Sequence, residues 1–206
     1  MNTTPIKTAH VVVGVTGSIA AHKAIDLVSL LTHWNSENVR CEVRVVMTAD
    51  AQKFVTEVPF RTLSRNAVVR DLYESDEQWS PRHIALADWA DLLVIAPATA
   101  NTIAKLACGI ADNALTCLAL ALHQETGMLI APAMNGRMWQ HPATEENVSI
   151  LKNRGVEFIG PDEGYFRRFQ PEFRGDALGR QLPPYHPHDS PFDHIRASAS
   201  GIYIPQ

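Results

Sequence analysis

The chain has 206 residues, of which 46% are hydrophobic and 19% charged, and its formal net charge is −4. This composition predicts one globular domain, and the absence of a basic stripe argues against nucleic acid or membrane as the main partner. No apolar run has the length of a membrane span, and the polar N-terminus lacks a signal-peptide core. Three cysteines without a C-x-x-C pair predict reduced thiols, a cytoplasmic protein and no metal site.

The first elements along the chain predict a βαβ unit. Residues 10–15 form a β-branched run that is apolar on both sides, which is typical of a buried parallel strand. Apolar residues then recur every three or four positions over 19–31, which indicates a helix. A second strand is expected over 41–47, and residues 48–51 begin a further helix with a capping residue.

The same alternation continues to about residue 165. Residues 55–81 are mixed in character, and we expect them to cover an edge of the sheet or to contact another subunit. The remaining expected elements are a helix over 85–90, a strand over 92–96 closed by Pro97, helices over 101–107 and 112–122, a strand over 127–131, a helix beginning at Thr144 and stopped by Gly155, and a strand over 156–159. Strands that alternate with helices predict an α/β fold with a doubly wound parallel sheet.

The C-terminal part differs in composition from the rest. Seven of the thirteen prolines and three of the nine histidines lie in positions 161–206, and hydrophobic periodicity is lost there. We therefore expect a domain over residues 1–164, followed by an irregular Pro/His-rich tail over residues 165–206.

Polar or glycine-rich loops follow four of the predicted strands. The turn Gly17-Ser18-Ile19 joins a strand to a helix, so its backbone N–H groups can bind phosphate, although close packing alone also explains a glycine there. Open α/β sheets bind ligands at the carboxyl ends of their strands. The candidate residues in the other three loops are Thr48, the run Thr99-Ala100-Asn101-Thr102, and Ala133-Met134-Asn135, and helix capping is the alternative role for Thr48 and Asn135.

His83 is the one candidate general base. It precedes a predicted helix, and its side chain titrates near neutral pH. A single histidine is more often a surface or structural residue, so spacing alone leaves both roles open.

Five motifs, in order between residues 17 and 135, resemble the flavin-containing cysteine decarboxylase family. The matching residues are Gly-Ser-Ile-Ala-Ala at 17–21, Val-Met-Thr at 46–48, His-Ile-x-Leu-x-x-Trp-Ala-Asp at 83–91, Pro-Ala-Thr-Ala-Asn-Thr at 97–102 and Pro-Ala-Met-Asn at 132–135. The third stretch supplies the histidine that the family places in its active site. Gly-Pro-Asp-Glu-Gly at 160–164 is most similar to the branch that serves coenzyme A biosynthesis.

The resemblance implies a flavodoxin-like, three-layer α/β/α protomer that forms a homotrimer, with FMN bound between subunits. It assigns FMN contacts to Gly17, Ser18, Ile19, Thr48, Thr99, Ala100, Asn101, Thr102 and Ala133. It makes Asn135 and Met134 substrate-binding residues, with Asn135 holding the substrate carboxylate, and it gives His83 the catalytic role.

The implied reaction is FMN-dependent decarboxylation of the cysteinyl carboxylate of 4'-phosphopantothenoylcysteine. In the family, the thiol is oxidised to a thioaldehyde, carbon dioxide leaves, and an ene-thiol forms. In the coenzyme A branch a cysteine in a substrate flap then helps to reduce the ene-thiol to a saturated thiol.

The chain departs from the family at this flap. Glu163-Gly164 is followed by Tyr165-Phe166-Arg167-Arg168, and no cysteine occurs after Cys117. We expect Cys108 and Cys117 to be small buried residues of helices. The chain could therefore stop at the ene-thiol, use another reductive route, or carry a degenerate C-terminus.

Other members of the family suggest alternative functions. A peptidyl-cysteine decarboxylase would act on the C-terminal cysteine of a peptide and release an ene-thiol. A non-catalytic FMN-binding regulatory flavoprotein would act by binding. A flavin prenyltransferase is disfavoured by the Pro-Ala-Met-Asn motif.

Overall fold

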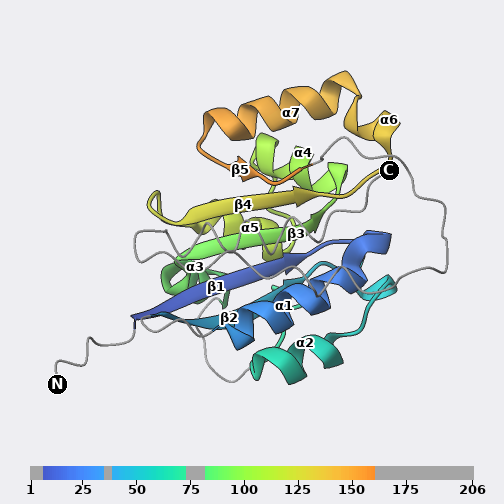
Figure 1. Cartoon of the computed structure of the whole chain (residues 1–206). Helices are drawn as coiled ribbons and strands as arrows, with labels where there is room; N and C mark the ends of the chain where they lie inside the picture. The colour runs from blue at the N-terminus through green and yellow to red at the C-terminus, as the bar shows by residue number, and fades with distance from the viewer. Residues whose placement is uncertain (1–6, 35–38, 73–81, 161–206) are drawn as a thin grey trace, which may run out of the picture.

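The protein folds around one sheet of five parallel strands in the order β2-β1-β3-β4-β5 (Figure 1). The computed structural model describes residues 7–34, 39–72 and 82–160. The strand order runs outward from β1 to β2 and then, on the other side, from β3 to β5. The order in which strands are added therefore reverses after β2, with the switch point between β1 and β3, and this confirms the predicted doubly wound topology.

The strands agree with the predicted runs of β-branched and apolar residues. They are β1 (Lys7–Val15), β2 (Val39–Met47), β3 (Leu92–Ala98), β4 (Gly127–Pro132) and β5 (Glu157–Phe158). Every residue of β3 is buried, as expected for a central strand that is covered on both faces.

The helices of the described residues connect these strands. They are α1 (Lys23–His33), α2 (Glu57–Ser64), α3 (Arg82–Trp89), α4 (Ala100–Cys108), α5 (Ala114–Ala121), α6 (Gly136–Trp139) and α7 (Pro142–Asn153), with short 3-10 turns η1 (Ile19–His22) and η2 (Ala51–Lys53). None of these helices is long and apolar enough to cross a membrane.

Two apolar cores, one on each face of the sheet, make the fold three-layered. Alternate residues of β1 point to opposite faces. Val11 and Val13 belong to the core that α1 and α2 cover, whereas Val12 belongs to the core under α3, α4, α5 and α7 (Figure 1). This arrangement confirms the flavodoxin-like α/β/α prediction.

The helix that was predicted to begin at residues 48–51 is only the 3-10 turn η2, and the α-helix of this region, α2, begins at Glu57. Helix α2 packs beside α1, and Val69 then continues the sheet edge, where its N–H donates to the carbonyl of Val45 over 2.9 Å. The expectation that this region covers a sheet edge is therefore confirmed up to residue 72. Residues 73–81 lie outside the described residues.

Three local predictions were wrong. Pro97 does not close β3, because the strand continues to Ala98 after an irregularity in its pairing with β4. Thr144 does not begin α7: the N-cap is His141, and Pro142 provides the preset φ that favours a first helical position. Cys108 is exposed rather than buried, because it is the last residue of α4, and Cys117 is only partly buried.

The described chain ends at Gly160, next to β5. The predicted domain boundary at residue 164, the tail over 165–206 and the diverged flap all lie outside the described residues.

Candidate functional site

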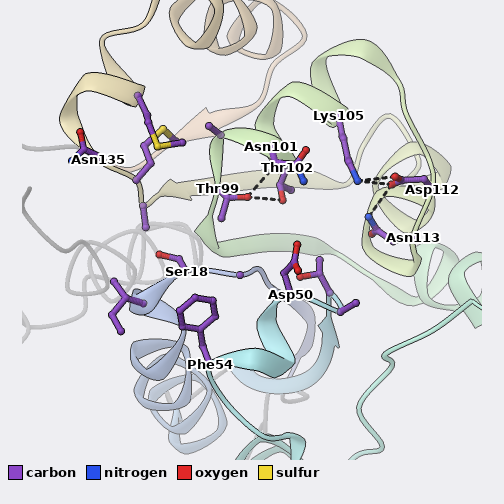
Figure 2. A pocket seen from close by; sticks show the side chains of 18 residues that line it. Ser18, Asp50, Phe54, Thr99, Asn101, Thr102, Lys105, Asp112, Asn113 and Asn135 are labelled. Carbon is purple, nitrogen blue, oxygen red and sulfur yellow. Dashed lines mark hydrogen bonds and ion pairs between the residues drawn. The ribbon is translucent and has the colours of Figure 1, made fainter.

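A cavity of about 700 Å³ opens at the carboxyl edge of the sheet (Figure 2). Its wall includes every residue that the sequence analysis proposed for cofactor or substrate binding. These residues are Gly17, Ser18, Ile19, Thr48, Thr99, Ala100, Asn101, Thr102, Ala133, Met134 and Asn135. Segments more than 110 positions apart meet here because the parallel strands all end at the same edge.

The loop after β1 packs closely against the loop after β2. A Cβ atom at Gly17 would collide with the Cβ of Asp50, so a residue without a side chain is needed there. The next residue, Ser18, is the N-cap of η1, and its hydroxyl accepts a hydrogen bond from the Ala20 N–H over 3.3 Å. Close packing and capping therefore both operate in this loop, and both keep it at the cavity wall.

The loop after β3 holds a pair of hydroxyl groups at the start of α4. Thr99 is the N-cap, and its Oγ1 accepts from the Thr102 N–H over 3.3 Å and lies 3.1 Å from the Thr102 hydroxyl. The exposed Asn101 lies between them on the first turn of the helix (Figure 2). Backbone N–H groups at this helix start have no partner within the helix and can be offered to an anion.

The loops after β2 and β4 provide one hydroxyl and one carboxamide. Thr48 Oγ1 accepts from the Ala51 N–H over 3.3 Å, at the start of η2. Asn135 Oδ1 accepts from the Arg137 N–H over 3.0 Å and thereby caps α6. The capping bond uses the oxygen of Asn135, so its NH₂ group supplies the donors that a bound carboxylate would need.

The cavity also contains an ion pair that the sequence analysis missed. Lys105 Nζ lies 2.7 and 2.9 Å from the two carboxylate oxygens of Asp112, and Asn113 Nδ2 donates to the same carboxylate over 3.0 Å (Figure 2). The Lys105 hydrogen bond holds the pKa of Asp112 below its usual value. This cluster lies at the opposite end of the cavity from Asn135 (Figure 2).

Three apolar side chains at the cavity are unusually exposed. Ile19 is 70% exposed, and Phe54 and Met138 are each 49% exposed. Of these, only Ile19 was a candidate from the sequence. Large exposed apolar groups beside a polar cavity are typical of a surface that a ligand or another chain covers.

His83 does not line this cavity. It lies near the start of α3 and is partly buried, and its Nδ1 atom is buried without a hydrogen-bond partner in the described part of the chain. A buried polar atom with no partner calls for an explanation. The structure of one chain therefore does not bring His83 together with the other candidate residues.

No group of three or more His, Cys, Asp or Glu side chains that could hold a metal ion occurs among residues 7–34, 39–72 and 82–160.

Comparison with known proteins places these features in a family. The family model described as Flavoprotein matches residues 1–169. A probable phosphopantothenoylcysteine decarboxylase of Streptococcus mutans is 42% identical over 154 residues, which cover 75% of this chain and 83% of that protein. The coenzyme A biosynthesis bifunctional protein CoaBC of Haemophilus influenzae is 42% identical over 156 residues, 76% of this chain. The match spans only 37% of that bifunctional protein.

Solved structures agree with the sequence comparison. The FMN-dependent cysteine decarboxylase SpaF superposes with a TM-score of 0.68 at 37% identity and covers 76% of this chain and 86% of SpaF. A mutant PPC decarboxylase complexed with pantothenoylaminoethenethiol gives a TM-score of 0.66 at 34% identity and covers 76% of this chain and 84% of that one. With its doubly wound sheet and its cavity at the carboxyl edge, the chain belongs to the flavoprotein family.

Proposed function

We propose that this protein binds FMN and decarboxylates a cysteinyl carboxylate, with 4'-phosphopantothenoylcysteine as the substrate. The observation that carries the proposal is the single cavity that unites the four loops after β1, β2, β3 and β4. Relatives named as phosphopantothenoylcysteine decarboxylases support this choice of substrate.

The residues of the cavity fit FMN in size and chemistry. A volume of about 700 Å³ lies within the range of small-molecule sites. Ile19, Phe54 and Met138 offer apolar surface to a flat ring. The hydroxyls of Ser18, Thr48, Thr99 and Thr102 suit a polyol chain, and the free N–H groups at the start of α4 suit a phosphate.

When bound, FMN would supply a two-electron acceptor for the thiol of the substrate's cysteine. The task of the protein is then to hold the substrate. The Asn135 NH₂ group is placed to donate hydrogen bonds to the substrate carboxylate, and its capping bond to Arg137 N–H fixes the direction of the side chain. Met134 supplies apolar contact next to it.

We propose that His83 acts at the cavity of a second copy of the chain. His83 does not line the cavity of its own chain, and this position is explained if a neighbouring subunit brings its cavity to α3. The exposed apolar groups at the cavity provide surface for such a contact. We accordingly propose a homotrimer in which His83 serves the cavity of the adjacent subunit.

The absence of a suitable thiol favours the ene-thiol as the product. None of the three cysteines in the chain lines the cavity, and none follows Cys117. The same feature favours the second candidate, a peptidyl-cysteine decarboxylase, which would also release an ene-thiol, and the peptidyl-cysteine decarboxylase EpiD is a structural relative. A flavin-binding regulatory protein without catalysis is the third possibility.

Mass spectrometry of the reaction separates these functions. The purified protein is incubated with FMN and either phosphopantothenoylcysteine or a peptide that ends in cysteine. Loss of carbon dioxide and two hydrogens from phosphopantothenoylcysteine is the expected result, and loss of carbon dioxide alone would instead indicate a saturated product. Turnover of the peptide alone would transfer the function to the peptidyl class, and flavin binding without turnover of either would contradict an enzymatic role.

A further inference from the structure

Thr16 is a buried polar residue that does not line the cavity but lies immediately before its first loop. The residue is only 1% exposed. The Thr16 hydroxyl donates to the Pro97 carbonyl over 2.6 Å and accepts from the Thr99 N–H over 3.1 Å. One side chain therefore joins the end of β1 to both the end of β3 and the start of α4.

Backbone hydrogen bonds join the other neighbouring loops at this edge. The Thr48 N–H donates to the Val15 carbonyl over 3.0 Å, and the Ala133 N–H donates to the Ala98 carbonyl over 2.9 Å. These bonds extend the sheet pairing past the ends of the strands. They fix the loop after β2 to β1, and the loop after β4 to β3.

A backbone hydrogen bond of this kind is not available between the ends of β1 and β3. Their paired register ends at Gly14 and Ile95. Pro97 follows two residues later and has no N–H to donate. The Thr16 hydroxyl supplies the link instead, because it can donate to one backbone group and accept from another at the same time.

The position of Thr16 gives this link a consequence for binding. Thr99, whose N–H it holds, is the N-cap of α4 and places its own hydroxyl in the cavity. Gly17, the next residue along the chain, also lines the cavity. We infer that Thr16 is a positioning residue for FMN binding, whose hydroxyl sets the spacing between the loop after β1 and the loop after β3. This inference rests on the proposed function.

Substitution of Thr16 by valine keeps the shape of the side chain and removes the hydroxyl. The Pro97 carbonyl and the Thr99 N–H then lose their partner in a buried place, so the two loops separate or tilt. We expect Thr16→Val to weaken FMN affinity by about tenfold or more. Thr16→Ser keeps the hydroxyl and is expected to bind FMN within about threefold of the unsubstituted protein.

Two controls distinguish positioning from general stability. Thr32→Val removes a hydroxyl that donates to the Val28 carbonyl within α1, remote from the cavity. Leu151→Ala leaves a space in the core under α7, where the side chain is 3% exposed, and so lowers stability without touching a loop of the cavity. Both variants should keep the FMN affinity of the unsubstituted protein at a temperature where they are folded.

The experiment is an FMN fluorescence titration of all five proteins, together with thermal unfolding of the ligand-free forms. Weak binding by Thr16→Val alone supports the inference. Equal FMN affinity in Thr16→Val and the unsubstituted protein overturns it, as does an equal loss in Leu151→Ala. If the unsubstituted protein does not bind FMN, the proposed function fails and the inference fails with it.

A second measurement applies if Thr16→Val does not fold. Hydrogen exchange of the unsubstituted, ligand-free protein reports directly on the Thr99 amide. Slow exchange at Thr99, retained in Thr16→Ser and faster in Thr16→Ala, supports the link. Exchange at Thr99 that is as fast as at the exposed Asn101 overturns it.

Discussion

Two hollows in the described part of the chain differ in construction, and Lys105 borders both of them. The cavity at the carboxyl edge has a volume of about 700 Å³ and is lined by loops that follow strands. A second groove, of about 380 Å³, is lined by the sides of α4, α5 and α7 and by the turn before β4. The cavity is therefore built from loops at the strand ends, whereas the groove is built from the sides of helices.

The polar groups of the two hollows are organised differently. In the cavity, Thr99 and Asn135 are N-caps, so helix geometry fixes their direction. In the groove, Leu120 and Ile110 are 64% and 48% exposed, and the Arg154 guanidinium donates to the Leu106 carbonyl. The cavity thus collects oriented donors and acceptors, whereas the groove presents mainly helix sides. Matched substitutions in the two hollows test this difference.

The largest effect is expected on turnover, from the change of Asn135 to aspartate. Aspartate keeps the acceptor that caps α6 but replaces the NH₂ donors by a negative charge, which repels a substrate carboxylate. We expect kcat/KM to fall on the order of 100-fold or more with FMN binding retained. Gln124→Glu makes the same chemical change in the groove and should leave kcat/KM unaltered. Equal kinetics for the two variants would refute the assignment of Asn135.

The next effect concerns one glycine from each hollow, Gly17 of the cavity and Gly109 of the groove. In Gly17→Ala the new methyl group collides with Asp50, so the loop after β1 must shift, and we expect FMN affinity to fall by about tenfold or more. Gly109→Ala borders the groove, where a Cβ meets no atom within 4 Å, but the φ of +70° strains it. It should cost about 1 kcal/mol of stability and leave FMN affinity intact. FMN titration and thermal unfolding of both variants measure these effects. An unaltered FMN affinity in Gly17→Ala would contradict the prediction.

A smaller effect is expected from the exposed apolar residues. Ile19→Ala removes surface that a flavin ring would cover, and FMN binding should weaken by about three- to tenfold. Leu120→Ala removes a similar area in the groove and should not alter FMN binding. Isothermal titration calorimetry of both variants tests the pair, and an equal loss in each would mean that Ile19 does not contact the cofactor.

The smallest effect concerns acid stability at the boundary between the hollows. The Lys105 hydrogen bond lowers the pKa of Asp112 in the folded protein from its ordinary value of 3.8. The pair therefore stabilises the fold above that value, and its contribution disappears as the pH falls through the lower, folded pKa. The Tm difference between the unsubstituted protein and Asp112→Asn should be constant from about pH 7 to pH 5 and vanish in stronger acid. A Tm difference that grows as the pH falls would contradict the stabilising role of the Asp112 carboxylate.

The sequence predicted the cavity well because one rule locates most of it. Loops after parallel strands meet at one edge, so Ser18, Thr48, Thr99 and Asn135 could be grouped before any coordinates were known. No such rule predicts the residues that line the groove. It depends on how the sides of α4, α5 and α7 pack, and periodicity does not specify that packing.

The cavity residues that were missed come from the same kind of packing. Separate helices over 101–107 and 112–122 were predicted, but only the turn between α4 and α5 shows that Lys105 reaches Asp112, seven positions later. Phe54 and Met138 had no polar signal in the sequence. His83 was a candidate general base from the sequence, its catalytic role was implied by resemblance to a family, and the position of α3 within one chain does not explain that role.

The most direct test of the account is equilibrium titration of the purified chain with FMN, with Gly17→Ala and Gly109→Ala measured alongside. The account predicts saturable binding of one FMN per chain, greatly weakened in Gly17→Ala and unchanged in Gly109→Ala. A chain that shows no saturable FMN binding, or binding that responds equally to both substitutions, would contradict it.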